Sequence, residues 1–501
     1  MRSNSRIVLS IFDILYFVGA VVSVIVCVLK SPECYASFVF LPMCFFVCLL
    51  LIVTFEKKRQ MTVNVALFCA FLRYVILPLF QSINPVYSFA RYNCTNSIVV
   101  NKAVLLMCYE LFIVSIFFVV YNRINTRGVD CCVDLNMENF KRMNRFPMCD
   151  NKQGIIIVFC ILSMCICFLH PSFFNQISFI FIKSDTGVRV GQVSSSAGTI
   201  DNILRQFFII SIFSLFIVIA TSLRNKHYDL RPKMAVNLSL LVSLCCVCVI
   251  ISEQRSSQVY CAFASIILMV QLFPEYKKKI IKVIIVGMAI VLVMLTIYKT
   301  FYAFKYESYW EAISRSSLNL NNLIQTMEIY LLGPITISSA IEFGATCGDV
   351  SLLQLLYDIC RSSIGLSFLM KGQNAVLTSS SYNMYVTGGR YTSGFLLPIT
   401  GQGYLTFGFI FSPVLICCCY YLALKLEKIM LNSNSTYVVY FSGYVFIRLA
   451  TCMVASNLNT VLNSITSIMI SAGVVYIIQL IVIKISKSRM CYIDEQSEGL
   501  F

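Results

Sequence analysis

Four arginines lie in polar stretches that separate apolar segments of the chain. Arg255 is in the short turn SEQRSS (252–257), Arg189 is in a loop rich in glycine and serine, and Arg361 and Arg390 are in the longest polar stretch. A guanidinium group binds two phosphate oxygens at once and stays charged at any working pH. Several of them at a bilayer surface would suit a diphosphate on a lipid carrier. The alternative is that they snorkel to lipid headgroups.

Five carboxylates in the same polar stretches are candidates for a general base. A hydroxyl group that attacks an activated substrate needs a carboxylate or an imidazole within hydrogen-bond reach. Glu253 is favoured because Arg255 is its near neighbour, but no pattern selects one carboxylate over the others. The five are Glu253, Glu307, Glu311, Asp349 and Asp358.

Three further charged residues, Arg73, Glu110 and Arg448, lie inside apolar segments. With a rise of about 1.5 Å per residue, Arg73 and Glu110 reach a similar depth in their helices. An unpaired charge at that depth is costly, so we predict a buried ion pair between them, with Arg448 as a competitor for the carboxylate. A structural pair is the more usual role, and a proton relay is the alternative.

The composition identifies the class of protein that positions these residues. Of the 501 residues, 58% are hydrophobic and 12% are charged, and the mean hydropathy is +0.81. Such a chain is expected to be a polytopic membrane protein. The net charge of +16 comes from basic residues in short loops, which is a topology signal and does not favour nucleic acid as a partner. Because Arg2 and Arg6 lead directly into an apolar segment, no cleavable signal peptide is expected.

Apolar runs long enough to cross a bilayer recur along the chain, and they predict about twelve transmembrane helices in a single integral membrane domain over residues 1–501. Most of the 24 cysteines fall in these runs as small apolar side chains, while Cys347 and Cys360 form one candidate disulfide outside them. The predicted spans are 8–29, 36–54, 61–80, 103–121, 154–169, 206–222, 234–251, 258–273, 282–298, 403–424, 438–455 and 465–485.

Lysine and arginine are concentrated in alternate loops, which places both termini in the cytoplasm. The same rule places the long polar stretch 301–402 on the outer face as a large extracytoplasmic loop before the tenth predicted helix. Residues 318–343 and 352–370 of this loop carry apolar residues at helical spacing, interrupted by Gly333 and Pro334. We therefore expect short amphipathic helices that lie on the membrane surface.

This layout, together with three short motifs, resembles the O-antigen polymerase (Wzy-type) family of oligosaccharide repeat-unit polymerases. The motifs are SEQRS (252–256), GGRYTS (388–393) and GQGYLTFG (401–408). Many members of that family carry an acidic residue where this chain has Gln402. The resemblance covers the whole chain in layout and about thirty residues in motif.

The resemblance implies glycosyl transfer, without a metal or other cofactor, at the outer face of the bacterial cytoplasmic membrane. Donor and acceptor would be oligosaccharides linked to undecaprenyl diphosphate, and the product would be an O-antigen, capsule or exopolysaccharide. A flippase and a chain-length regulator of the same pathway are implied as partners, beside the lipid bilayer. The implied catalytic residues are Arg255, Glu253 and Arg390, and the implied diphosphate- and glycan-binding residues are Arg189, Arg361, Lys371, Tyr391 and Tyr404.

Two other functions stay open. A lipid-linked oligosaccharide flippase also has about twelve spans, but it would lack the long loop and would line a central cavity with charges such as Arg73 and Arg448. An O-antigen ligase would carry an outward histidine in the long loop, and residues 301–402 contain none. The sequence has no GxxxxGK[ST] motif, so ATP hydrolysis is not expected to drive the reaction. It has no outward DxD-like cluster, which disfavours a metal-dependent transferase.

Overall fold

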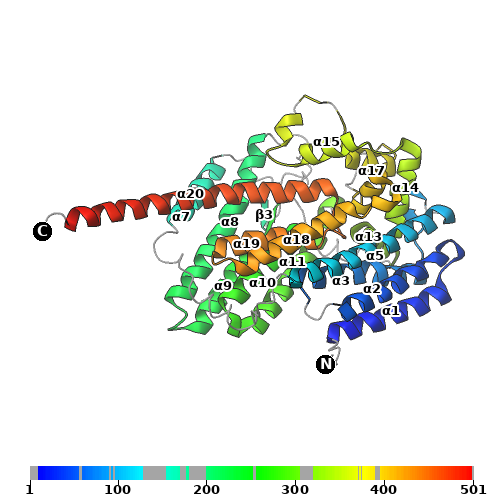
Figure 1. The fold of residues 1–501 in the computed structure, drawn as a ribbon, viewed down its shortest axis with the longest axis horizontal. Coiled ribbons are helices and arrows are strands. Elements are labelled where there is room, and N and C mark those ends of the chain that lie inside the picture. The colour runs from blue at the N-terminus through cyan, green and yellow to red at the C-terminus, as the bar shows by residue number, and fades with distance from the viewer. Residues whose placement is uncertain are drawn as a thin grey trace. The chain divides into compact units, whose positions relative to one another are not determined.

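The structure is a computed structural model, and it describes residues 10–55, 59–89, 92–93, 96–127, 154–169, 177–179, 199–251, 255–304, 320–370, 372–373, 375–389 and 395–498. Helices account for most of these residues (Figure 1), and the strands form two short antiparallel pairs. The chain divides into two compact units. Unit 1 comprises Met1–Cys132, Leu318–Glu427 and Arg448–Ser464, and unit 2 comprises Val133–Ser317, Lys428–Ile447 and Ile465–Phe501.

The N-terminal part of unit 1 is a group of long apolar helices, drawn in blue in Figure 1. The first of them begins at a capping box, in which Ser10 and Asp13 each accept a hydrogen bond from the other's backbone N–H. Its helices are α1 (Ile11–Lys30), the 3₁₀ helix η1 (Glu33–Val39), α2 (Phe40–Phe55), α3 (Met61–Phe71), the π-helical turn η2 (Leu72–Ile76), α4 (Leu77–Ile83) and α5 (Ser97–Arg127), and strands β1 (Ser88–Phe89) and β2 (Tyr92–Asn93) precede α5.

A carboxylate from a distant part of the chain fixes the start of α3. Glu427, on α18 (Val414–Asn432), accepts hydrogen bonds from the backbone N–H groups of Met61, at 2.6 Å, and Thr62, at 2.9 Å. The first N–H groups of a helix have no partner within it, and a negative charge is stabilised at that end by the helix dipole. Glu427 therefore ties α18 to α3 within unit 1.

The rest of unit 1 comes from the predicted outer loop and the segment that follows it. Its helices are α13 (Leu320–Leu331), α14 (Pro334–Cys347), α15 (Leu352–Ser362), the 3₁₀ helix η6 (Ser367–Met370), α16 (Thr378–Thr387), α17 (Ile399–Phe411) and the greater part of α18. The start of α20 (Leu458–Glu498) also belongs to this unit.

Helices α13 and α14 form a bent pair, with an angle of 59° between them, that is apolar enough to be one broken membrane span or a re-entrant loop. The bend lies at Leu332, whose φ of 53° is rare for a residue with a side chain, and at Gly333. A Cβ atom on Gly333 would overlap the side chains of Glu328 and Leu77. A larger residue at this position would have to displace the ends of these two side chains where the two helices meet α4.

The expectation that residues 318–343 form helices on the membrane surface is wrong for α14. Ten of its residues between Pro334 and Gly344 are buried, and it packs against α5 and α17. Small side chains allow the close approach to α17, where a Cβ on Gly401 would lie 3.0 Å from the Cβ of Ala340. A helix that is apolar or small on every side is a core helix, whereas a surface helix has one polar face.

The predicted span 403–424 is not one straight helix. It is divided between α17 and α18, which meet at an angle of 106°. Pro413 lies in the break and cannot donate a helical hydrogen bond, and Gly408, with a φ of 72°, introduces a second irregularity. A Cβ on Gly403 would overlap the backbone carbonyl of Ser412.

We expect Gly403→Ala to destabilise the protein by about 1–3 kcal/mol, the usual cost of overpacking a tight contact. The clash is with backbone, which cannot move aside as a flexible side chain can. Gly473→Ala, in α20, is the matched control because a Cβ there meets nothing within 4 Å. Thermal unfolding in detergent should show a lower midpoint for Gly403→Ala alone. Equal midpoints would mean that the bend does not need glycine.

The described residues contain six helices that are long and apolar enough to cross a membrane, or up to eight if each bent pair is one span. The chain is therefore a polytopic, helical membrane protein, as predicted. The number of twelve spans stays a prediction. Several of the other predicted spans fall on shorter apolar helices, namely Ile156–Ile166, Pro232–Cys248, Ser257–Leu272 and Thr436–Ala450.

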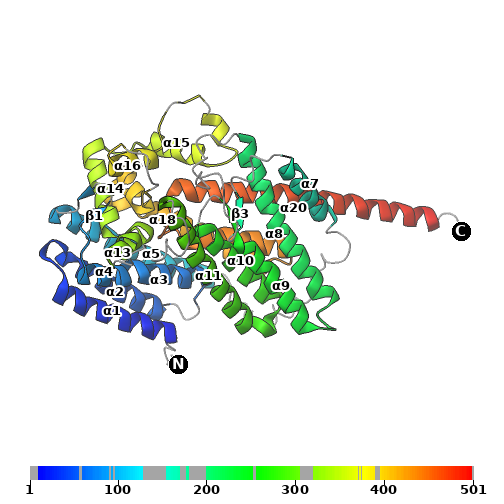
Figure 2. The same cartoon turned by 180° about the vertical axis from the view of Figure 1, so that it is seen from behind.

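Unit 2 is also helical, and Figure 2 shows α8, α9, α10 and α11 packed together. An aromatic cluster fills part of its core, where the ring of Tyr440 lies 5.4 Å from that of Phe213 and 5.7 Å from that of Phe216, between centroids. Its elements are α7 (Gly154–Phe168), β3 (Ile177–Phe179), α8 (Thr199–Lys226), α9 (Pro232–Cys248), β4 (Val249–Ile251), α10 (Arg255–Leu272), η5 (Pro274–Tyr276), α11 (Lys277–Phe304), most of α19 (Thr436–Ala450) and the rest of α20.

Candidate functional site

Several residues predicted for the site lie outside the described residues. Arg255 is the first residue of α10, but its side chain is not described. The predicted residues outside the description are Glu253, Arg390, Arg189, Lys371 and Tyr391, together with the candidate bases Glu307 and Glu311.

Arg361 and Tyr404 are described, and both belong to unit 1. Arg361 is exposed in the last turn of α15. Tyr404 is half-buried in α17, and the Nζ of Lys102 lies 5.1 Å from the centroid of its ring. Within the described part of the chain, no hydrogen bond joins Arg361 to Tyr404.

Of the two candidate bases that are described, Asp349 is exposed and Asp358 is completely buried. Asp358 lies on α15, outside every candidate span. Its Oδ1 accepts hydrogen bonds from Gln354 Nε2 and from the backbone N–H of Thr378, both at 3.1 Å. Its Oδ2 accepts one from Gln402 Nε2, also at 3.1 Å. The carboxylate thus joins α15 to the start of α16 and to α17.

These three hydrogen bonds do not use every acceptor position of the Asp358 carboxylate. A carboxylate offers about four acceptor positions, and the three bonds described use two on Oδ1 and one on Oδ2. The neighbouring Gln402 Oε1 is buried and has no partner among the described residues. The Thr378 hydroxyl is buried without another partner among the described residues and also stabilises the Asp358 carboxylate. A ligand hydroxyl that donates to Asp358 Oδ2, beside the unpaired carbonyl of Gln402, would add to this contact or replace it.

Burial raises the pKa of the Asp358 carboxyl above its ordinary value, although the hydrogen bonds from Thr378 and Gln354 act in the opposite direction. A carboxylate whose pKa is raised holds an abstracted proton more readily, which suits a general base. Arg361 follows three residues later on the same helix, so an exposed cation lies one helical turn from the buried carboxylate.

A second polar contact continues the cluster at the start of α16. Asn459, at the start of α20, donates through Nδ2 to the hydroxyl of Ser379 at 2.8 Å. Its Oδ1 is buried without a partner among the described residues. Ser379 follows Thr378, whose backbone N–H bonds to Asp358, so the unpaired amide oxygens of Gln402 and Asn459 belong to two separate hydrogen-bonded groups at the start of α16. Unpaired buried acceptors favour a ligand rich in O–H or N–H donors.

The sequence did not single out Gln354, Ser379 or Asn459. A signal was present for Gln354 and Asp358, which are four residues apart and share one face of α15. Asp358 lies on the buried side of that helix with Leu355, while Leu352, Leu353 and Leu356 are exposed. The helix is amphipathic and forms within the predicted surface segment 352–370, and its contact with lipid stays a prediction.

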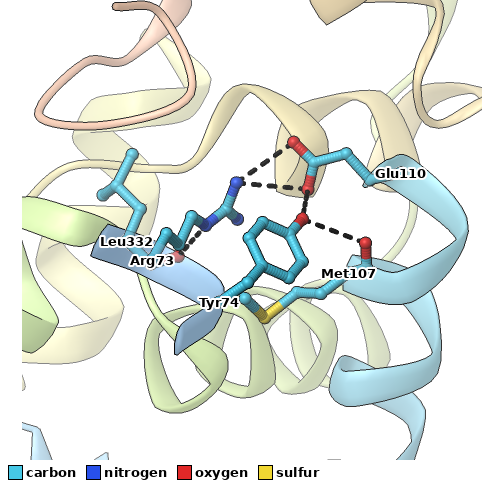
Figure 3. Close-up of polar contacts among 5 residues, drawn as sticks. All are labelled: Arg73, Tyr74, Met107, Glu110 and Leu332. Carbon is cyan, nitrogen blue, oxygen red and sulfur yellow. Dashed lines mark hydrogen bonds and ion pairs between the residues drawn. The ribbon is translucent and has the colours of Figure 1, made fainter. Parts of the chain in front are cut away.

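The predicted ion pair between Arg73 and Glu110 is confirmed. Figure 3 shows the guanidinium of Arg73 facing the carboxylate of Glu110, with Nη1 at 3.1 Å from Oε1 and 3.2 Å from Oε2. The Tyr74 hydroxyl donates to the same carboxylate at 3.2 Å, and Arg73 Nε donates to the carbonyl of Leu332 at 2.9 Å. Both charged residues are at most 1% exposed. The pair therefore holds α5 and η2 against the bend between α13 and α14.

Arg73→Met alone should destabilise the protein by about 3–5 kcal/mol, because it leaves the Glu110 carboxylate buried without a cation. The double variant Arg73→Met, Glu110→Leu removes both charges and should recover most of that loss. Thermal unfolding in detergent compares the two variants with the wild type. A double variant as unstable as the single one would mean that the ion pair itself is the stabilising element.

Among the described residues, no three His, Cys, Asp or Glu side chains come together as metal ligands would. Cys347 and Cys360 are both free thiols, so the candidate disulfide is not formed. No protein-family model matches the chain, and neither a curated protein nor a solved structure shows significant similarity to it.

Proposed function

We propose that this chain is a membrane glycan polymerase that joins oligosaccharide repeat units carried on undecaprenyl diphosphate. The observation that supports this function best is the environment of Asp358. It is a buried carboxylate outside the candidate spans, its pKa is raised, and the amide oxygen of its hydrogen-bond partner Gln402 is unpaired among the described residues. This combination suits a base that receives a proton from a sugar hydroxyl.

In this mechanism the acceptor hydroxyl donates to Asp358 Oδ2 beside Gln402 Oε1. The carboxylate takes the proton while the hydroxyl oxygen bonds to the anomeric carbon of the donor sugar. The bond from that carbon to the diphosphate breaks, and undecaprenyl diphosphate leaves with the electron pair. Fixed cations stabilise the negative charge that develops on the leaving group. Arg361 is proposed for this role, together with Arg390 of the same unit. A role of Arg189 and Arg255, which belong to unit 2, stays a prediction from the sequence.

The reaction is proposed to take place at the outer face of the bacterial cytoplasmic membrane, with both termini in the cytoplasm. The activated bond is already present in the lipid-linked donor, so the reaction needs neither ATP nor an ion gradient. A flippase would deliver the repeat units, and a chain-length regulator is a further proposed partner.

Two observations favour this function over the alternatives. Arg73, which a flippase would use to line a cavity, is instead buried in an ion pair with Glu110. The long segment 301–402 contains no histidine, which an O-antigen ligase would be expected to use.

Deleting the gene from the cells that carry it tests the proposal. Without the polymerase, single repeat units should still cross the membrane and be transferred to their final acceptor. The cell surface should therefore carry acceptors with one repeat unit each and no long chains. A flippase defect would leave the lipid-linked units facing the cytoplasm, and no capped units would reach the surface. That second pattern would overturn the proposal.

A further inference from the structure

A second buried carboxylate, Glu328 on α13, lies four residues before the bend at Leu332 and is 1% exposed. Its Oε1 accepts hydrogen bonds from the backbone N–H of Thr336, at 2.8 Å, and from the Thr336 hydroxyl, at 3.1 Å. Its Oε2 accepts a hydrogen bond from Gln81 Nε2 on α4. All three donors are uncharged, and no ion pair to Glu328 occurs among the described residues.

The charged groups around Glu328 do not neutralise it. Arg73 donates hydrogen bonds to the Glu110 carboxylate and to the backbone carbonyl of Leu332. The charges of Arg73 and Glu110 therefore neutralise each other. From α16, Tyr382 is uncharged and its hydroxyl is 2.6 Å from that of Ser339. The carboxylate of α14 is Glu342, which is in the C-terminal half of that helix and half-buried. Helices α4 and α14 pack against α13, and neither brings a cation to Glu328.

The positive end of α14 offsets part of the charge on Glu328, since a helix N-terminus carries about half an elementary charge. The remainder is an isolated negative charge in an apolar interior, which is costly. Protonation removes this cost. The protonated carboxyl then needs a buried acceptor for its O–H group.

Gln81 can provide that acceptor. The side chain is completely buried, and its Oε1 has no partner among the described residues. A half-turn of the amide would exchange Nε2 and Oε1, so that Oε1 faces Glu328 Oε2. The pair can thus hold a hydrogen bond in either state, with the amide donating to the carboxylate or accepting from the carboxylic acid.

We propose that Glu328, with Gln81 as its partner, is a proton-binding site at the bend between α13 and α14. A proton taken from water bonds to Glu328 Oε2, and no other bond forms or breaks apart from hydrogen bonds. A monovalent metal cation fits less well, because N–H groups point at both carboxylate oxygens. This site is independent of the proposed glycosyl transfer at Asp358.

Dicyclohexylcarbodiimide tests the site directly. This apolar reagent adds to protonated carboxyl groups, and the adduct can be located by mass spectrometry of peptides from the full-length protein in detergent. We expect an adduct on Glu328 when the reaction is run at acidic pH and none when it is run at alkaline pH. The adduct should also be absent in Glu328→Gln. Glu110, which is equally buried but paired with Arg73, is the matched control and should not react at any pH. Protection of Glu328 by Na⁺ at constant pH would identify a metal-cation site and overturn the proposal.

Infrared difference spectra between acidic and alkaline pH do not depend on access by the reagent. On acidification the wild type should show a carbonyl band of protonated Glu328 that is missing in Glu328→Gln, whereas a band of the buried Asp358 should occur in both proteins. The Glu328 band should persist in Asp349→Asn, which changes an exposed carboxylate. If the wild-type and Glu328→Gln spectra are identical, Glu328 does not bind a proton and the proposal is wrong.

Discussion

Asp358→Asn is expected to lower the rate of glycan polymerisation by about 10²–10⁴-fold, the usual contribution of a general base. Asparagine has nearly the same shape and can still accept the bond from Thr378, but it cannot take up the proton of the attacking hydroxyl. The rate is measured with purified protein and lipid-linked repeat units. Asp349→Asn is the matched control, because it removes an exposed carboxylate nearby in the sequence.

Two further measurements separate a chemical role of Asp358 from a structural one. Its base form is lost on acidification, and its raised pKa means that this loss begins at a higher pH than for an ordinary aspartate. The wild-type rate should therefore fall as the pH falls through that raised pKa, and Asp358→Asn should lack this limb. Unfolding midpoints identify simple destabilisation. A folded Asp358→Asn protein with wild-type turnover would remove Asp358 from the mechanism.

Arg361→Ala is expected to reduce turnover about ten- to a hundredfold, which corresponds to a charge-assisted hydrogen bond of roughly 1.5–3 kcal/mol. The effect should be on turnover if the contact strengthens in the transition state. Arg361→Lys should recover little, because an ammonium group lacks the guanidinium fork. Since Arg361 is exposed in the last turn of α15, its loss should leave the fold intact. The sequence predicts the same result for Arg255→Ala.

Arg231→Ala is the matched control for the loss of positive charge, because Arg231 is exposed and is predicted to face the cytoplasm. It should retain wild-type chain lengths in cells and wild-type turnover in detergent. If Arg361→Ala behaves like this control, the exposed guanidinium only contacts solvent or lipid headgroups. In that case Arg361 is not a ligand of the diphosphate.

The ion pair between Arg73 and Glu110 could be predicted because an unpaired charge inside a membrane protein is energetically costly. Two opposite charges at a similar depth in neighbouring helices are therefore expected to form an ion pair. The sequence could not show that Arg73 also donates to the carbonyl of Leu332. That contact depends on a bend between two helices, and the bend depends on packing between segments far apart in the chain.

The interruption at Gly333 and Pro334 was predicted, whereas the break inside 403–424 was missed for a related reason. A hydropathy window averages over a bend, so 403–424 reads as one span although α17 and α18 meet at 106°. Pro413 was a local signal of this break, but proline also occurs in unbroken transmembrane helices. Only the packing of Gly403 against Ser412 makes the second bend specific.

Asp358 was one of several equivalent carboxylates in the sequence. Its selection needs three hydrogen bonds from residues 354, 378 and 402, which are brought together by the packing of α15, α16 and α17. The fold class follows from composition and the length of apolar runs. The candidate site follows only from tertiary contacts.

Reconstituting the purified protein with lipid-linked repeat units tests the proposed polymerase activity most directly. The reaction contains a chelator and neither ATP nor an ion gradient, and its products are separated by size. We expect a ladder in which successive products differ by one repeat unit, and no ladder with Asp358→Asn. If the folded wild-type protein leaves the substrate as single units, with or without added divalent metal, it is not a polymerase of lipid-linked glycans.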